Sequence, residues 1–150
     1  MNRTELFVKK LFEGLDIMYP SQLSLEYIAQ SLNLSIIYWP FSSELTLYKG
    51  IYKVFINENI NKYRQWQDFG HEMYHYFHDE VSYDLLKETY AVYGESKANY
   101  FSYHFCVPTF MLLNMKEISI EKVINLFKVE YDFAYRRLKM FESKIIDGGG

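Results

Sequence analysis

The chain combines two apolar patterns, one repeating every three to four residues and one repeating every second residue. The first is typical of helices with one buried face, and the second of half-buried strands. Helices are expected over 4–15, 25–32, 62–78, 83–93, 95–107, 118–127 and 131–141. Strands are expected over 34–39, 44–49 and 51–57. No repeat or linker interrupts this order, which predicts a single domain over residues 1–147 and a flexible tail or cloning scar at 148–150.

Capping and breaking residues indicate where several helices begin and end. Thr4 is a candidate N-cap for the first helix, because its hydroxyl can accept a hydrogen bond from an unpaired backbone N–H. Gly94 is expected to interrupt the helical pattern. Pro108 ends the helix that follows, since proline lacks the N–H that the helix interior requires.

The three predicted strands lie directly before the longest predicted helix. Gly50 favours a tight turn, so the strands over 44–49 and 51–57 are expected to form a hairpin. A polar turn then leads into the helix that begins at about residue 62. This order brings a sheet edge close to that helix, and extended peptides commonly bind by adding a strand to such an edge. The strand at 51–57, or its hairpin partner, is therefore either a substrate-binding edge or a purely structural hairpin.

The helix from residue 62 carries an H-E-x-x-H motif at His71, Glu72 and His75. Two histidines four residues apart lie on the same helical face, so their ring nitrogens can converge on one zinc ion. Glu72 is placed to act on a zinc-bound water as a general base. The helix also has an apolar stripe on another side, formed by Trp66, Phe69, Met73 and Phe77. A helix buried on one side, with both histidines on the other, is what a metal cleft requires.

Composition narrows the class of protein. A chain of 150 residues with 49% hydrophobic residues is long enough for a core without disulfides. The net charge of −3 shows no excess of basic residues of the kind that binds nucleic acid. No apolar run is long enough to span a membrane. Cys106 is the only cysteine, which makes the cytoplasm the expected compartment. Fifteen tyrosines and twelve phenylalanines fit either an aromatic core or a peptide-binding cleft.

A catalytic zinc usually has three protein ligands and a water, so the motif needs one more ligand. His78 shares the histidine face, but it is displaced by roughly 7.5 Å along the helix axis from the midpoint of His71 and His75. That gap is too wide for a zinc bond of about 2.1 Å. His78 is expected at the rim of the site or on the surface.

Glu95 is the favoured third ligand because a separate helix can direct its carboxylate at the open side of the metal. Ala98, Asn99, Ser102 and Cys106 share its face and are mostly small, which allows close approach to the motif helix. His104 faces the opposite way. Glu88 lies seven residues earlier and is the reserve candidate.

These residues together resemble the ImmA/IrrE-type zinc metallopeptidases. The resemblance rests on His71-Glu72-x-x-His75, then Glu95-x-x-Ala98-Asn99-x-Phe101, and then Pro108. It extends from the helix at 25–32 to the helices within 123–138 and so covers most of the chain. The family pattern is more specific than the short motif alone.

The resemblance implies an α+β, zincin-like fold, mostly helical, with a small three-stranded antiparallel or mixed sheet before the motif helix. It implies one zinc per chain, held by His71, His75 and Glu95, with Glu72 as the catalytic carboxylate. Family members characteristically act on helix-turn-helix repressors of prophages, mobile elements or stress responses. The expected function is thus a regulatory endopeptidase that cleaves such a protein substrate, with no membrane partner.

The chain departs from the family pattern at three positions. Tyr74 stands where a small residue is common, His78 comes three rather than four residues after the second motif histidine, and Ser102 replaces a usual alanine. None removes a ligand, although Tyr74 could narrow the cleft. Tyr74, Tyr103 and His78 are all candidates for stabilising the transition state or supporting the metal site, and the sequence does not choose among them.

Two other classes of function stay open. The chain could be a binding module that recognises a repressor or toxin without cutting it. Alternatively, the helices at 118–141, with Arg136 and Arg137, could read DNA. Few basic residues lie there, so direct DNA binding is not expected.

Overall fold

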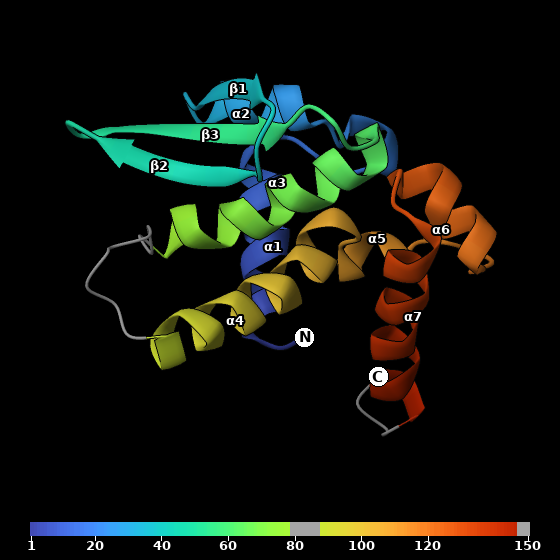
Figure 1. The fold of residues 1–150 in the computed structure, drawn as a ribbon. Helices are drawn as coiled ribbons and strands as arrows, with labels where there is room; N and C mark the ends of the chain where they lie inside the picture. The colour runs from blue at the N-terminus through green and yellow to red at the C-terminus, as the bar shows by residue number, and fades with distance from the viewer. Residues whose placement is uncertain (79–87, 147–150) are drawn as a thin grey trace. The chain divides into compact units, whose positions relative to one another are not determined.

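A computed structural model describes residues 1–78 and 88–146, and their side chains except at 88–93 and 145–146 (Figure 1). The chain divides into two compact units. The sheet unit is Ser24–Ser102, and the helical unit combines Met1–Leu23 with Tyr103–Gly150. A single domain over residues 1–147 stays a prediction, and the tail at 148–150 lies outside the described residues.

The sheet unit holds a three-stranded mixed sheet, as the sequence predicts. Its elements are α2 (Leu25–Ser31), β1 (Ser35–Trp39), β2 (Glu44–Tyr48), β3 (Ile51–Asn57), α3 (Lys62–Phe77) and most of α4 (Glu88–Cys106). The strand order is β1-β3-β2, with β1 parallel and β2 antiparallel to β3. The central position of β3 corrects one expectation. β3 has neighbours on both sides and cannot be a substrate-binding edge, whereas its hairpin partner β2 is an edge strand.

The β2–β3 hairpin turns at Lys49 and Gly50, with Tyr48 paired to Ile51. Both turn residues have positive φ, 51° at Lys49 and 77° at Gly50. This is the geometry of a two-residue hairpin turn that matches the twist of the strands, and glycine adopts it without strain. The predicted hairpin and its turn are therefore confirmed.

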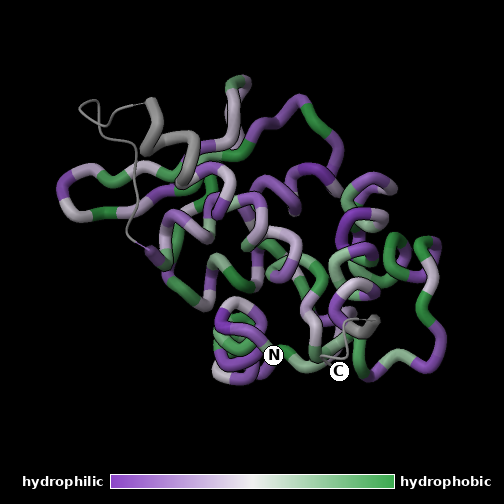
Figure 2. Tube along the Cα trace, turned by 90° about the horizontal axis from the view of Figure 1, so that it is seen from below, coloured by the Kyte–Doolittle hydropathy of each residue, from purple (hydrophilic) through white to green (hydrophobic). Residues whose placement is uncertain are grey.

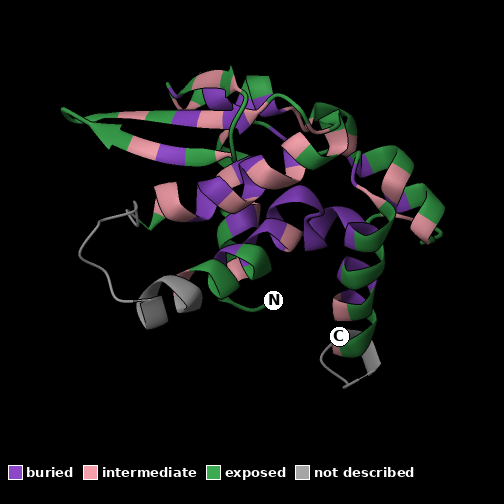
Figure 3. Ribbon diagram, viewed as in Figure 1, coloured by how far each residue is buried: buried purple, intermediate pink, exposed green. Residues whose placement is uncertain are grey.

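Helix α3 packs on the sheet through β2 and β3 (Figure 1). Val54 and Ile56 of β3 are fully buried, and from α3 the buried apolar side chains include Phe69 and Met73. Figure 3 shows this burial as bands along β3 and α3. Asn61 caps the helix by accepting a hydrogen bond from Arg64 N at 2.9 Å, and the helix ends at Phe77. The apolar stripe thus fixes which side of α3 is left for the motif histidines.

Helix α4 runs through Gly94 without a break, which corrects the expected interruption. A glycine inside a helix costs only about 1 kcal/mol relative to alanine, and the backbone hydrogen-bond pattern can continue across it. The first part of the predicted helix at 83–93 lies outside the described residues.

The helical unit contains α1 (Arg3–Gly14), the short helix η1 (Pro20–Gln22), α5 (Thr109–Leu113), α6 (Ile120–Phe127), α7 (Tyr131–Ile146) and the end of α4. Asn2, not Thr4, caps α1. Its side chain accepts from Glu5 N, and Glu5 Oε1 accepts from Asn2 N, each at 2.9 Å. This reciprocal pair satisfies two backbone donors, so the helix begins earlier than Thr4 predicts. Figure 2 shows hydrophilic and hydrophobic residues alternating along these helices.

A buried polar network lies inside the helical unit. Arg137, 1% exposed, donates to Val107 O and Thr109 Oγ1, each at 2.8 Å. Thr109 donates to Glu5, and Lys144 forms an ion pair with the same carboxylate. Burial raises the pKa of Glu5, but the hydrogen bonds from Lys144, Thr109 and the Asn2 backbone prevail and lower the pKa to about 2. The Arg137 side chain is therefore buried in the core and is not part of a surface that could read DNA.

Within the described residues, no helix is both long and apolar enough to cross a membrane.

Candidate metal centre

His71 and His75 lie one turn apart on α3, with ring centroids separated by 5.3 Å. The carboxylate of Glu95, from α4, contacts both rings. Its Oε2 lies 2.8 Å from His71 Nε2, and its Oε1 lies 3.0 Å from His75 Nε2. Two imidazole nitrogens therefore converge with a carboxylate that lies 24 and 20 positions further along the sequence.

Asn99 holds His71 from the side opposite Glu95. His71 Nδ1 donates to Asn99 Oδ1 at 2.8 Å, so Nδ1 carries the ring proton and Nε2 faces the carboxylate. Burial lowers the pKa of His71, yet the hydrogen bond to Glu95 and the charge of Glu72 outweigh it and raise the pKa. Because Nδ1 already carries the proton of a neutral ring, the lone pair of Nε2 faces the carboxylate. This close contact is favourable only with a proton or a metal ion between Nε2 and Glu95.

The donor set fits a catalytic zinc. Zinc accepts two histidines and one carboxylate as ligands and leaves one position open. The hydrogen bonds from His71 and His75 also lower the pKa of Glu95, so this carboxylate is ionised, as a metal ligand must be. Within residues 1–78 and 88–146, the buried His75 Nδ1 has no hydrogen-bond partner. His71, Glu72 and His75 also offer ligand atoms within 4.8 Å of one another.

Glu72 lies beside His71 but is held differently. Its Oε1 accepts the backbone N–H of Leu45, on β2, at 2.8 Å, and its Oε2 lies 3.9 Å from His71 Nε2. The side chain is buried, and this burial raises the pKa of Glu72 to about 7 against the opposing effects of His71 and the Leu45 N–H. One oxygen is therefore fixed by the sheet while the other faces the histidines.

A cavity of about 410 Å³ opens beside these groups. It is lined by Ser42, Ser43, Asn57, Ile60, Arg64, Asp68, His71, Glu72 and Glu95. All of these residues belong to the sheet unit. The site therefore has room next to His71 and Glu95 for part of a bound molecule.

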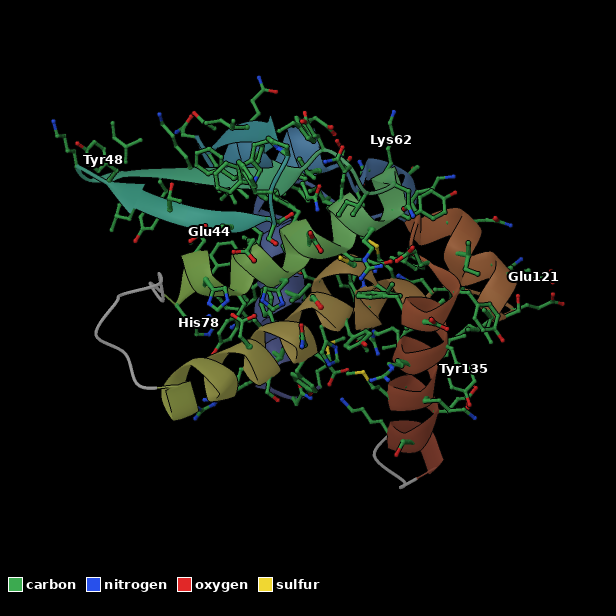
Figure 4. All side chains as sticks on the ribbon, viewed as in Figure 1. Glu44, Tyr48, Lys62, His78, Glu121 and Tyr135 are labelled. Carbon is green, nitrogen blue, oxygen red and sulfur yellow. The ribbon has the colours of Figure 1, made fainter. Side chains whose placement is uncertain are left out.

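The three candidates for transition-state or supporting roles lie in different surroundings. Tyr74 is buried, and its ring packs on Phe101 at 5.8 Å and stacks on His78 at 4.1 Å. His78 is exposed at the end of α3, where Nδ1 donates to Tyr74 O at 2.8 Å (Figure 4). Tyr103 belongs to the helical unit and packs against Phe133 at 4.5 Å. His78 thus takes the peripheral position that the helix geometry predicts.

Glu88, the reserve candidate, and His104, which is discounted as a ligand, complete the residues considered beside Glu95. The side chain of Glu88 lies outside the described residues. His104 is buried in the helical unit, where burial and the charge of Arg137 lower its pKa to about 3.

Sequence reasoning placed Asn99 on the face of Glu95 but missed its contact with His71, and it missed the Leu45 amide altogether. Asn99 is four residues after Glu95 and so shares its helical face, a spacing that could have indicated its contact with His71. The contact of the Leu45 N–H could not be predicted from the sequence, because every residue except proline has a backbone N–H. Its contact with Glu72 depends on which side of β2 faces α3.

Comparisons with known proteins identify the family. The family model described as the IrrE N-terminal-like domain, Peptidase_M78, matches residues 29–139. The Bacillus subtilis protein named uncharacterized protein YqaB is 34% identical over 146 residues, which cover 94% of this chain and 85% of that protein. The phage-like element PBSX protein XkdA of the same organism is 32% identical over 149 residues, or 96% of this chain and 75% of that protein.

A solved structure supports the fold. The chain matches a Mycobacterium tuberculosis transcriptional regulator with a TM-score of 0.66 at 14% identity. The match covers 92% of this chain and 47% of the regulator, so the chain spans about half of that protein's length. The family match includes the H-E-x-x-H helix, Glu95 and Asn99, and the fold is the expected α+β arrangement. The chain belongs to the Peptidase_M78 family, whose defining unit is the IrrE N-terminal-like domain.

Proposed function

We propose that the chain is a zinc-dependent endopeptidase with His71, His75 and Glu95 as the zinc ligands and Glu72 as the general base. The observation that carries this proposal is the meeting of Glu95 with both imidazole Nε2 atoms, at 2.8 and 3.0 Å. The family match supports a peptidase-like role. Two residues of α3 and one of α4 supply the ligand set of known zinc peptidases.

The residues around the metal can carry the proton steps of peptide hydrolysis. A bound zinc ion would supply Lewis acidity for the scissile carbonyl and lower the pKa of the attacking water. Glu72 Oε1 is held by Leu45 N–H, which leaves Oε2 to take a proton from that water. The same oxygen then returns the proton to the leaving amine. Asn99 keeps His71 in the tautomer that turns Nε2 toward the metal.

Strand β2 offers the substrate a backbone to pair with. Leu45 N–H points toward α3 and away from β3, since it donates to Glu72. In an antiparallel pair, the backbone N–H and C=O groups of successive residues point alternately toward the partner strand and away from it. Leu47, two residues after Leu45, therefore also directs its N–H and C=O away from β3. An extended peptide could pair there by adding a strand to the sheet. We therefore assign substrate binding to the β2 edge.

The substrate we propose is a helix-turn-helix repressor of a prophage or mobile element. This rests on the resemblance to ImmA/IrrE-type peptidases, and the relative named as a phage-like element protein supports it. Cleavage of such a repressor would relieve repression. The exposed Arg136 and the buried Arg137 offer little surface for direct DNA binding.

The first test is the zinc content of the purified protein. We expect one zinc per chain in the wild type and a large loss in Glu95→Ala, with Glu142→Ala as a control on an exposed glutamate of α7. The second test incubates a repressor encoded beside the gene with wild type and with Glu72→Gln. Cleavage by the wild type alone supports the proposal. A wild type that cannot be loaded with zinc would contradict it.

A binding module that recognises a repressor or toxin without cutting it is the alternative. A zinc-loaded wild type that forms a stable complex with the intact repressor, and yields no fragments, would favour it.

A further inference from the structure

The start of β2 is attached to α3 at two successive points. Ser43 Oγ donates to Asp68 Oδ2 at 2.5 Å and accepts the backbone N–H of Asn57 at 3.0 Å. Two residues further along the chain, Leu45 N–H donates to Glu72 Oε1 at 2.8 Å. The serine hydroxyl therefore joins the end of β3 to the helix that carries the catalytic motif.

The spacing of the two attachments matches on both elements. Asp68 and Glu72 are four residues apart, which is a rise of roughly 6 Å along a helix. Ser43 and Leu45 are two residues apart, which is roughly 6.7 Å along an extended chain. The extended segment and the helix can therefore run side by side with both contacts satisfied. Figure 4 shows Glu44, between the two attached residues, at the start of β2 beside α3.

We propose that Ser43 and Asp68 are positioning residues for Glu72, because their hydrogen bond holds the Leu45 amide where it fixes one oxygen of the Glu72 carboxylate. The proposal rests on the role of Glu72 as the general base and adds the residues that orient it. Neither Ser43 nor Asp68 needs to touch the substrate for this effect. Both act through the backbone of β2.

The edge position of β2 explains why an added attachment is needed. β2 pairs with β3 on one side only, so at its start the other side is held by the contacts of Ser43 and Leu45 with α3. Glu72 is 8% exposed, and a buried carboxylate that loses its hydrogen-bond donor turns toward another one. His71 Nε2 lies 3.9 Å from the second oxygen. A shift of Leu45 would therefore turn Glu72 toward a metal ligand and away from its catalytic orientation.

Amide hydrogen exchange of Leu45, followed by NMR, tests the proposal without any assay of activity. We expect this amide to exchange about tenfold faster in Ser43→Ala than in the wild type, with a smaller increase in Asp68→Asn. Ser35→Ala, the same substitution at an exposed site on β1, is the matched control and should leave Leu45 unchanged. The amides of β3 report whether each variant keeps its fold. An unchanged Leu45 amide in both folded variants overturns the proposal.

Cleavage of the repressor supplies a second readout. We expect kcat to fall about tenfold in Ser43→Ala, with KM and zinc content within twofold of the wild type, and Ser43→Thr to restore much of kcat. Equal losses of zinc in Ser43→Ala and Glu95→Ala would overturn the positioning role. A wild type that cleaves nothing defeats the proposed function, while the exchange of Leu45 still decides whether Ser43 and Asp68 position Glu72.

Discussion

Asn99 and Glu95 contact the two ring nitrogens of the same imidazole, that of His71, from one face of α4. One turn of helix separates them, so a single rigid element both fixes the orientation of the ring and supplies the neighbouring carboxylate. The ring cannot rotate without losing both contacts. The position of α4 thus determines the orientation of the His71 ring.

Replacing Asn99 by alanine should weaken zinc binding by about tenfold, because partners that orient a metal-bound histidine typically contribute 10–100-fold in affinity. Asn99→Asp keeps an acceptor for His71 Nδ1 and should retain most of the affinity. Competition with a zinc chelator measures both variants. Equal affinity in Asn99→Ala and wild type would show that α3 alone orients His71.

Glu72→Gln should bind zinc like the wild type but cleave at least about a thousandfold more slowly, since the amide accepts no proton from the attacking water. Its side-chain oxygen can still accept the Leu45 N–H, so the fold should persist. Zinc content and single-turnover cleavage of the repressor are the two measurements. Residual cleavage close to that of the wild type would assign the base to another residue.

Acid should destabilise the helical unit through Glu5. Its pKa in the folded protein is about 2, below the ordinary value of 4.5. Its stabilising effect is therefore complete above about pH 5 and declines as the pH falls from 4.5 toward 2. Glu5→Gln should remove on the order of 2 kcal/mol at pH 7 and make unfolding less pH-dependent in this window. Urea unfolding at pH 7 and pH 3 checks this, with exposed Glu13→Gln as the control.

Arg137→Ala should destabilise the protein by about 3 kcal/mol, because it leaves the Val107 carbonyl without this donor and disturbs the buried Thr109–Glu5 contact. Arg136→Ala, one position earlier and exposed, should cost less than about 0.5 kcal/mol. Thermal unfolding separates the two. Similar melting temperatures would mean that water satisfies the groups that Arg137 now contacts.

Much of the site could be inferred from sequence because it depends on local helical spacing. His71, Glu72 and His75 lie within one turn, and Glu95 begins a recognisable pattern on a second helix. The same holds for the β2–β3 hairpin, whose turn needs residues that accept positive φ.

The remaining features depend on tertiary contacts that local patterns do not specify. The central place of β3 arises from its parallel pairing with β1, which adjacency in sequence does not predict. Leu45 reaches Glu72 across 27 positions of sequence. Asn2 displaces Thr4 as the cap because its partner Glu5 also belongs to the buried network.

The ion pair between Glu5 and Lys144 has a consequence for synthesis on the ribosome. The sheet unit is continuous from Ser24 to Ser102, so all of its residues are synthesised before α7. The helical unit is discontinuous, and its network joins residues 139 positions apart. Nascent α1 therefore gains this contact only after α7 has been synthesised, whereas His71, His75 and Glu95 are all synthesised earlier.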